Sequence, residues 1–119
     1  MQNPLELGSV EQTLERASLL SLMNDRRRKA ASVFNERLVV GYAGGLFRAD
    51  SNTIATAKTL MEITNPLIMI DMNDNPIKIE DGEDFLRELT GVLAEASADY
   101  HRAIEEINAL RTKEGLTNV

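Results

Sequence analysis

The sequence predicts a helix-dominated α+β fold: a long N-terminal helix, a small antiparallel β-hairpin sheet with a short helix, and a long C-terminal amphipathic helix with a heptad seam. Two stretches, 9–37 and 81–113, are long and free of Pro. Between them, β-branched and aromatic runs alternate with Gly, Asn and Pro, which is typical of strands and turns. Aromatic residues make up only 4% of the 119 residues, and there is no Trp. A core of Leu, Ile, Val, Ala and Met suits helix packing.

The N-terminal helix is predicted over 9–37. Ser9 and Gln12 have the spacing of a capping box, in which each side chain satisfies a backbone N–H of the first turn. Apolar residues then recur at helical spacing, although 24–29 is wholly polar. We expect residues 1–8 to form a flexible lead.

Two hairpins and a short helix are predicted next. Residues 38–48 place a Gly pair between β-branched and aromatic residues, and glycine tolerates the positive φ of tight turns. Asp50 to Asn52 supply N-cap oxygens for a short helix over 53–62. Residues 67–70 and 77–79 flank the turn formers Asn-Asp-Asn-Pro and predict a second hairpin. We expect three or four short strands in one small sheet.

The last helix is predicted from Asp81 to about Lys113, with Gly115 as its stop and 114–119 as a tail. Residues 38–113 are expected to form a single domain with the N-terminal helix. Apolar residues of the last helix are spaced 3 and 4 apart in strict alternation, which we name the heptad seam: Leu86, Leu89, Leu93, Ala96, Tyr100, Ala103, Ile107 and Leu110.

The heptad seam predicts that the last helix packs on another helix, because a long helix keeps such a seam in line only by supercoiling on a partner. The spacing is the same whether that partner is the chain's own N-terminal helix, a second copy of the chain or another protein. Both the intramolecular and the intermolecular interpretation stay open, and a homo-oligomer is expected.

Composition argues against several classes of protein. The chain has no Cys, so disulfides, thiolate metal sites and cysteine nucleophiles are excluded. No signal peptide is apparent, and the longest strongly apolar run, 67–70, is too short to span a membrane. The net charge of −6 makes nucleic acid an unlikely partner overall.

Chemistry-bearing motifs are sparse. His101 is the only histidine, and no motif places a Ser or Asp to form a triad with it. The acidic residues 80–84 are explained by a helix N-terminus, and Asp71 to Asn75 by turn chemistry. The glycines lack a phosphate-loop pattern. We therefore expect no enzyme activity, no metal and no cofactor.

The one basic cluster, Arg26, Arg27, Arg28 and Lys29, points around the whole helix circumference rather than along one stripe. A solvated segment or a dock for the acidic last helix is the simplest interpretation. The alternative is a contact for a small anionic ligand.

From about Arg28 to Leu110 the order of features resembles an uncharacterised domain family found in tail-fibre and tail-fibre-assembly proteins of tailed bacteriophages. The matching features are the basic and Ala-rich 28–31, the hairpin end with Asp50-Ser51 (45–51), a short helix over 54–61, two strands within 67–79 and a long helix over 85–110. The family often has Trp-Lys where this chain has Ile70-Asp71-Met72. No catalytic residues are implied by the resemblance.

The resemblance implies a phage-encoded tail-fibre assembly factor, chaperone-like, or a small tail-associated protein that acts by helix-mediated binding. Its partner would be a tail fibre or another tail protein, and its location the cytoplasm of the infected bacterium or the virion. The alternative hypothesis is a phage counter-defence protein that binds a host effector or sequesters a nucleotide signal.

Overall fold

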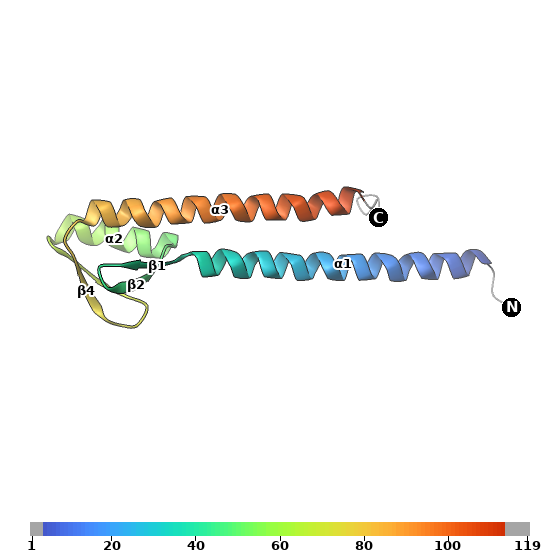
Figure 1. Cartoon of the computed structure of the whole chain (residues 1–119), viewed down its shortest axis with the longest axis horizontal. Helices are drawn as coiled ribbons and strands as arrows, with labels where there is room; N and C mark the ends of the chain where they lie inside the picture. Colours follow the sequence, from blue (N-terminus) through green and yellow to red (C-terminus); the bar gives the residue numbers. More distant parts are fainter. Residues whose placement is uncertain (1–3, 114–119) are drawn as a thin grey trace. The chain divides into compact units, whose positions relative to one another are not determined.

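A computed structural model describes residues 4–113, with side chains described for residues 10–110. Its helices and strands follow one another in the predicted order and confirm the helix-dominated α+β class (Figure 1). The elements are α1 (Pro4–Arg37), β1 (Val39–Tyr42), β2 (Gly45–Arg48), α2 (Ser51–Ile63), β3 (Leu67–Ile70), β4 (Pro76–Ile79) and α3 (Gly82–Lys113).

The helix ends differ from the predicted ends at one important place. α1 begins at Pro4, so residues 4–8 are helical and Ser9 lies inside the helix, not at its cap. Proline suits a first helical position, because its missing N–H would have no partner there. Asp50 and Asp81 cap α2 and α3: their carboxylates accept the N–H of Thr53 at 2.8 Å and of Asp84 at 3.0 Å. Residues 1–3 and the predicted stop and tail at 114–119 lie outside the described residues.

Contacts within the chain group the residues into two compact units, where we predicted a single domain. Unit 1 comprises Met1–Ser32 and His101–Val119, of which 4–32 and 101–113 are described. Unit 2 comprises Val33–Tyr100. The two hairpins, α2 and the first part of α3 therefore belong to unit 2.

The first hairpin of unit 2 pairs β1 with β2, from Val39 opposite Arg48 to Tyr42 opposite Gly45. Its turn residues are Ala43 and Gly44, which have φ of 50° and 85°. Positive φ at both central residues is the geometry of the tight turn that suits a twisted hairpin. Gly45 starts β2 and is buried: a Cβ there would lie 2.7 Å from the Ile77 Cγ1 atom. The second hairpin thus approaches the first through this glycine.

The second hairpin pairs β3 with β4, from Leu67 opposite Ile79 to Ile70 opposite Pro76. The strands form two separate two-stranded sheets and not the single sheet that we predicted. A backbone hydrogen bond links the hairpins: the N–H of Met72 donates to the carbonyl of Leu46 at 2.7 Å.

The core of unit 2 lies between the hairpins, α2 and α3. Aromatic rings mark its centre: the ring centroid of Phe85 lies 4.9 Å from that of Phe47 and 5.1 Å from that of Tyr42. The Tyr42 hydroxyl donates to Asp84 Oδ2 at 2.8 Å, and this bond, together with burial and nearby carboxylates, raises the pKa of Tyr42 to about 12. The buried apolar side chains of this core are Leu38, Phe47, Ala49, Ile54, Ala57, Leu67, Met69, Ile79, Phe85, Leu89 and Ala96.

Unit 1 has a much smaller core. Met23 of α1 packs against Ile107 of α3, with Leu19 and Ile104 half-buried beside them. The Arg27 guanidinium donates to Asn108 Oδ1 at 3.2 Å across the same pair of helices. Met23 and Ile107 are the only buried side chains among those that the structure describes in this unit.

Candidate functional site

The heptad seam is divided between the two units. In unit 2, Leu89 and Ala96 are buried in the core, and Leu86 and Leu93 are half-buried against it. The ring of Tyr100 is half-buried, with its centroid 5.0 Å from that of Phe34. In unit 1, Ile107 is buried against Met23. Ala103 and Leu110 are half-buried.

This placement limits what the seam can do for a partner. Leu89, Ala96 and Ile107 are each 5% exposed or less. A partner protein would reach these three side chains only if the unit that holds them opened.

The basic cluster lies on α1 in unit 1. Arg26, Arg28 and Lys29 are exposed, and Arg27 is half-buried. Arg28 pairs with Asp25 at 2.5 Å, and Arg27 donates to Asn24 Oδ1 as well as to Asn108. Two of the four cations thus have partners within unit 1.

The acid–base candidates are exposed side chains. The His101 ring lies one helical turn from Glu105, with Nε2 at 3.5 Å from Oε1, and it is 74% exposed. In the described part of the chain, no group of three or more His, Asp or Glu residues is placed to hold a metal ion.

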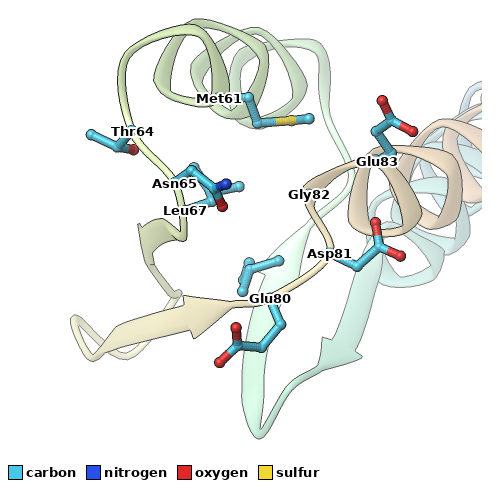
Figure 2. A pocket seen from close by; sticks show the side chains of 9 residues that line it. Met61, Thr64, Asn65, Leu67, Glu80, Asp81, Gly82 and Glu83 are labelled. Carbon is cyan, nitrogen blue, oxygen red and sulfur yellow. The ribbon is translucent and has the colours of Figure 1, made fainter.

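A hollow of about 250 Å³ lies where α2, the Asn65–Pro66 cis peptide and the start of α3 meet. Met61 reaches down into it from α2, above the connection of residues 80–82 (Figure 2). The carboxylates of Glu80 and Glu83 point in opposite directions and not toward a common centre (Figure 2). Glu80 also pairs with Lys78 at 3.3 Å, and Asp81 caps α3. The hollow therefore has no converging set of charges for a ligand.

Asp71 is a residue whose importance the sequence did not reveal. Its Oδ1 atom accepts the N–H groups of Asn73 at 3.0 Å and Asn75 at 2.9 Å, and Oδ2 accepts that of Leu46 at 3.0 Å. The hydrogen bonds from Asn75, Leu46 and Asn73 hold the pKa of this carboxyl below its usual value, although burial opposes them. Asp71 therefore closes one hairpin and fastens it to the other.

An exposed apolar surface lies on the outer side of the hairpins. Four large side chains there are between 43% and 60% exposed, and we name them the hairpin face: Leu46, Ile68, Ile70 and Met72. Ile68 and Ile70 alternate with the buried Leu67 and Met69 along β3. Leu46 adjoins Met72 through the backbone bond between the hairpins. The two hairpins therefore bring Leu46 and Met72 next to each other along the backbone.

The sequence of β3 contains a signal for this face, which lies in its uninterrupted apolar run. A strand with one face on a core and one in water usually alternates apolar and polar residues. Residues 67–70 read Leu-Ile-Met-Ile, which is apolar on both faces. Such a strand is expected to be covered on both sides.

A second exposed apolar region lies on α1. Val10, Leu14, Leu20 and Leu22 are between 41% and 63% exposed, within unit 1. The sequence identified these positions as apolar, but it did not show that α3 leaves them uncovered.

No protein-family model, curated protein or solved structure matches the chain. Within the described residues, no helix is long and apolar enough to cross a membrane.

Proposed function

We propose that the chain is a non-enzymatic protein-binding module that helps to assemble phage tail fibres, and that the hairpin face is its binding surface. The observation that carries this proposal is the apolar character of both faces of β3. Ile68 and Ile70 point away from a core that Leu67 and Met69 already occupy. Exposed apolar patches mark interaction sites in proteins.

The order of elements gives further support. The resemblance to the tail-fibre family rests on a basic, Ala-rich helix, a hairpin, a short helix after Asp50-Ser51, two further strands and a long helix. The secondary structure from α1 to α3 follows the same order. The assignment to tail fibres rests on that resemblance, whereas the binding surface rests on the exposure of named side chains.

The mechanism would be physical. Ile70 at the end of β3 and Met72 in the turn that follows would cover an apolar surface of an unassembled fibre polypeptide. Covering that surface lowers aggregation until the fibre oligomerises and buries it. A module of this kind would act in the cytoplasm of the infected bacterium, or stay in the virion as a tail component.

The test is co-purification with the tail-fibre polypeptides of the phage that encodes the chain. The tagged full chain should retain a fibre polypeptide, and the variant Ile70→Lys/Met72→Lys should lose it, because lysine heads cannot enter an apolar interface without a large desolvation cost. Both side chains are exposed, so the variant should fold.

The matched control adds the same charge elsewhere in unit 2. Ala94→Lys/Ser97→Lys places two lysines at exposed positions of α3, and this variant should retain the fibre. If both variants bind equally well, the hairpin face is not the binding surface. If the unmodified chain retains no fibre polypeptide, the tail-fibre assignment fails.

Quantifying the protein in purified phage particles separates the two forms of the proposal. A chaperone should be absent from particles, and a tail component should be present in a fixed ratio to the fibre.

The counter-defence alternative has less support. Its candidate ligand contacts are Arg26, Arg27, Arg28 and Lys29, of which Arg27 and Arg28 already contact side chains of unit 1. A high absorbance at 260 nm in the purified protein would favour that alternative, since the chain has two Tyr and no Trp and absorbs weakly itself.

A further inference from the structure

The part of α1 that precedes and includes Met23 is apolar around most of its circumference. Val10, Leu14 and Ala17 share one side of the helix, because they are spaced four and three residues apart. Leu19 follows Val10 by nine residues, roughly two and a half turns, so it lies on the opposite side. Leu20 and Leu22 flank the two sides. We name residues 10–23 the apolar segment.

Unit 1 covers only one side of this segment. Met23 and Leu19 pack against Ile107 and Ile104 of α3. Val10 and Leu14, on the other side, are 58% and 63% exposed. A helix that is apolar all round is normally surrounded by other helices, and an isolated helix gains little stability in water. The apolar segment therefore has the character of a helix within a larger bundle.

The charges of α1 indicate what covers it. Residues 4–15 contain three acidic residues and no basic one, whereas residues 16–29 contain five basic residues and one acidic. Glu11, Glu15, Arg26 and Lys29 are all exposed. An antiparallel pair of identical helices that cross within the apolar segment would bring the acidic part of each beside the basic part of the other. A parallel pair would place like charges together.

We propose that α1 binds α1 of a second copy in antiparallel orientation, crossing near Ser18, to form a twofold-symmetric dimer. Such an interface uses the same surface on both copies. The apolar segments supply the contact area, and the complementary charges set the orientation. This proposal concerns unit 1 and is independent of the fibre-binding role of the hairpin face in unit 2.

The first experiment measures the mass of the full chain by sedimentation equilibrium over a wide concentration range. The unmodified chain should fit a monomer–dimer equilibrium. Val10→Lys/Leu14→Lys should weaken the dimer on the order of a hundredfold, while Ala94→Lys/Ser97→Lys should not. A monomer at every concentration, or a dimer that Val10→Lys/Leu14→Lys leaves intact, would overturn the proposal. Unchanged melting of the tyrosine signal shows that unit 2 of each variant is folded, and an unchanged signal at 222 nm shows that the helices of both units are kept.

The second experiment fixes the orientation, and it uses the absence of native Cys. Ala17→Cys, on the exposed side and next to the crossing, should form a disulfide between two copies under mild oxidation. Ser32→Cys should not form this disulfide. Ser32 lies fourteen residues beyond the crossing, at about 1.5 Å per residue, and in an antiparallel pair the two copies extend from the crossing in opposite directions, so the two Ser32 residues lie far apart. Ala17 and Ser32 are both exposed. Equal cross-linking at the two positions would exclude the antiparallel orientation.

A charge exchange tests the electrostatic part. Glu11→Arg/Glu15→Arg and Arg26→Glu/Lys29→Glu should each weaken the dimer about three- to tenfold, the range expected for exposed ion pairs. A mixture of the two variants should restore association as a heterodimer. If neither variant weakens the dimer, charge does not select the orientation and the proposal fails in its antiparallel form.

Discussion

Asp71 shows how one side chain can determine the arrangement of two hairpins. Its carboxylate accepts N–H groups from both sides: Asn73 and Asn75 within its own turn, and Leu46, 25 residues earlier in the chain. Asp71 is 7% exposed. A buried carboxylate that receives several backbone hydrogen bonds favours its charged form. The Ile70 and Met72 side chains of the hairpin face flank this residue directly in the sequence.

We predict that Asp71→Asn lowers the melting temperature at neutral pH. An amide has a single oxygen. If that oxygen accepts the N–H groups of Asn73 and Asn75, the amide NH2 group faces the N–H of Leu46, and two hydrogen-bond donors then lie against each other. Because the folded-state pKa of Asp71 lies below the ordinary value of 3.8, its contribution is present above that pH and is lost as the pH falls through the folded-state pKa. The difference in melting temperature between the two proteins should therefore narrow below pH 3.8.

The control for this prediction lies in the same turn. Asp74 has φ of 60°, a conformation that asparagine tolerates, so Asp74→Asn should melt close to the unmodified chain. Thermal melts followed by circular dichroism between acidic and neutral pH provide the measurement. A constant difference for Asp71→Asn at every pH would show that its charge is not responsible.

Among the elements, the helices α1 and α3 take part in two cores of very unequal size. Leu89 is one of eleven buried residues in the cluster of unit 2, whereas Met23 and Ile107 are the two buried residues of the cluster in unit 1. Removing a buried Met or Leu side chain costs about 2–5 kcal/mol. In unit 1 this loss would remove half of the buried core, so its helices should lose structure well before unit 2 does.

We predict that Met23→Ala separates two melting transitions. Both tyrosines, Tyr42 and Tyr100, belong to unit 2, so near-ultraviolet dichroism reports that unit alone, while the signal at 222 nm reports helices of both. Met23→Ala should lower the midpoint temperature of the transition seen at 222 nm and leave that of the tyrosine signal nearly unchanged. Leu89→Ala should lower the midpoint temperature of the tyrosine signal.

Met23→Leu is the matched control, because a swap of similar volume costs less than about 1.5 kcal/mol. Coincident transitions in Met23→Ala, with both probes shifted equally, would contradict the prediction and indicate one cooperative structure.

The elements also show which features of the fold a sequence can carry. The caps at Asp50 and Asp81, the hairpins and the course of α3 depend on neighbouring residues, and local patterns predicted them. The bond from Leu46 to Asp71 depends on residues far apart in sequence, so no local pattern indicated it. The heptad seam predicted that α3 packs on something, but its spacing is identical for a partner within the chain and for one outside it. In the structure, other residues of the same chain bury Leu89 and Ile107, and the spacing alone could not indicate this.

At the scale of the whole molecule, charge and core are distributed unevenly. Residues 33–100 contain five basic and twelve acidic residues, together with all but two of the buried apolar side chains that the structure describes. Unit 1 contains the basic cluster and a long helix whose apolar segment is partly exposed. Unit 2 therefore has the core of a stable small domain, whereas the stability of unit 1 should depend on what binds to it.

Amide hydrogen exchange followed by mass spectrometry should make this dependence visible. Amides in the first part of α3, residues 85–96, lie over the core of unit 2 and should exchange slowly at every protein concentration. Amides of the apolar segment of α1 belong to a helix with one covered side, and local opening should expose them readily.

Association stabilises the bound form by mass action. Exchange in residues 10–23 should therefore slow as the protein concentration rises, and Val10→Lys/Leu14→Lys should abolish that dependence. Exchange in this segment that is slow and independent of concentration would mean that unit 1 is stable without a second copy, and the covered side at Met23 would then be sufficient to hold α1.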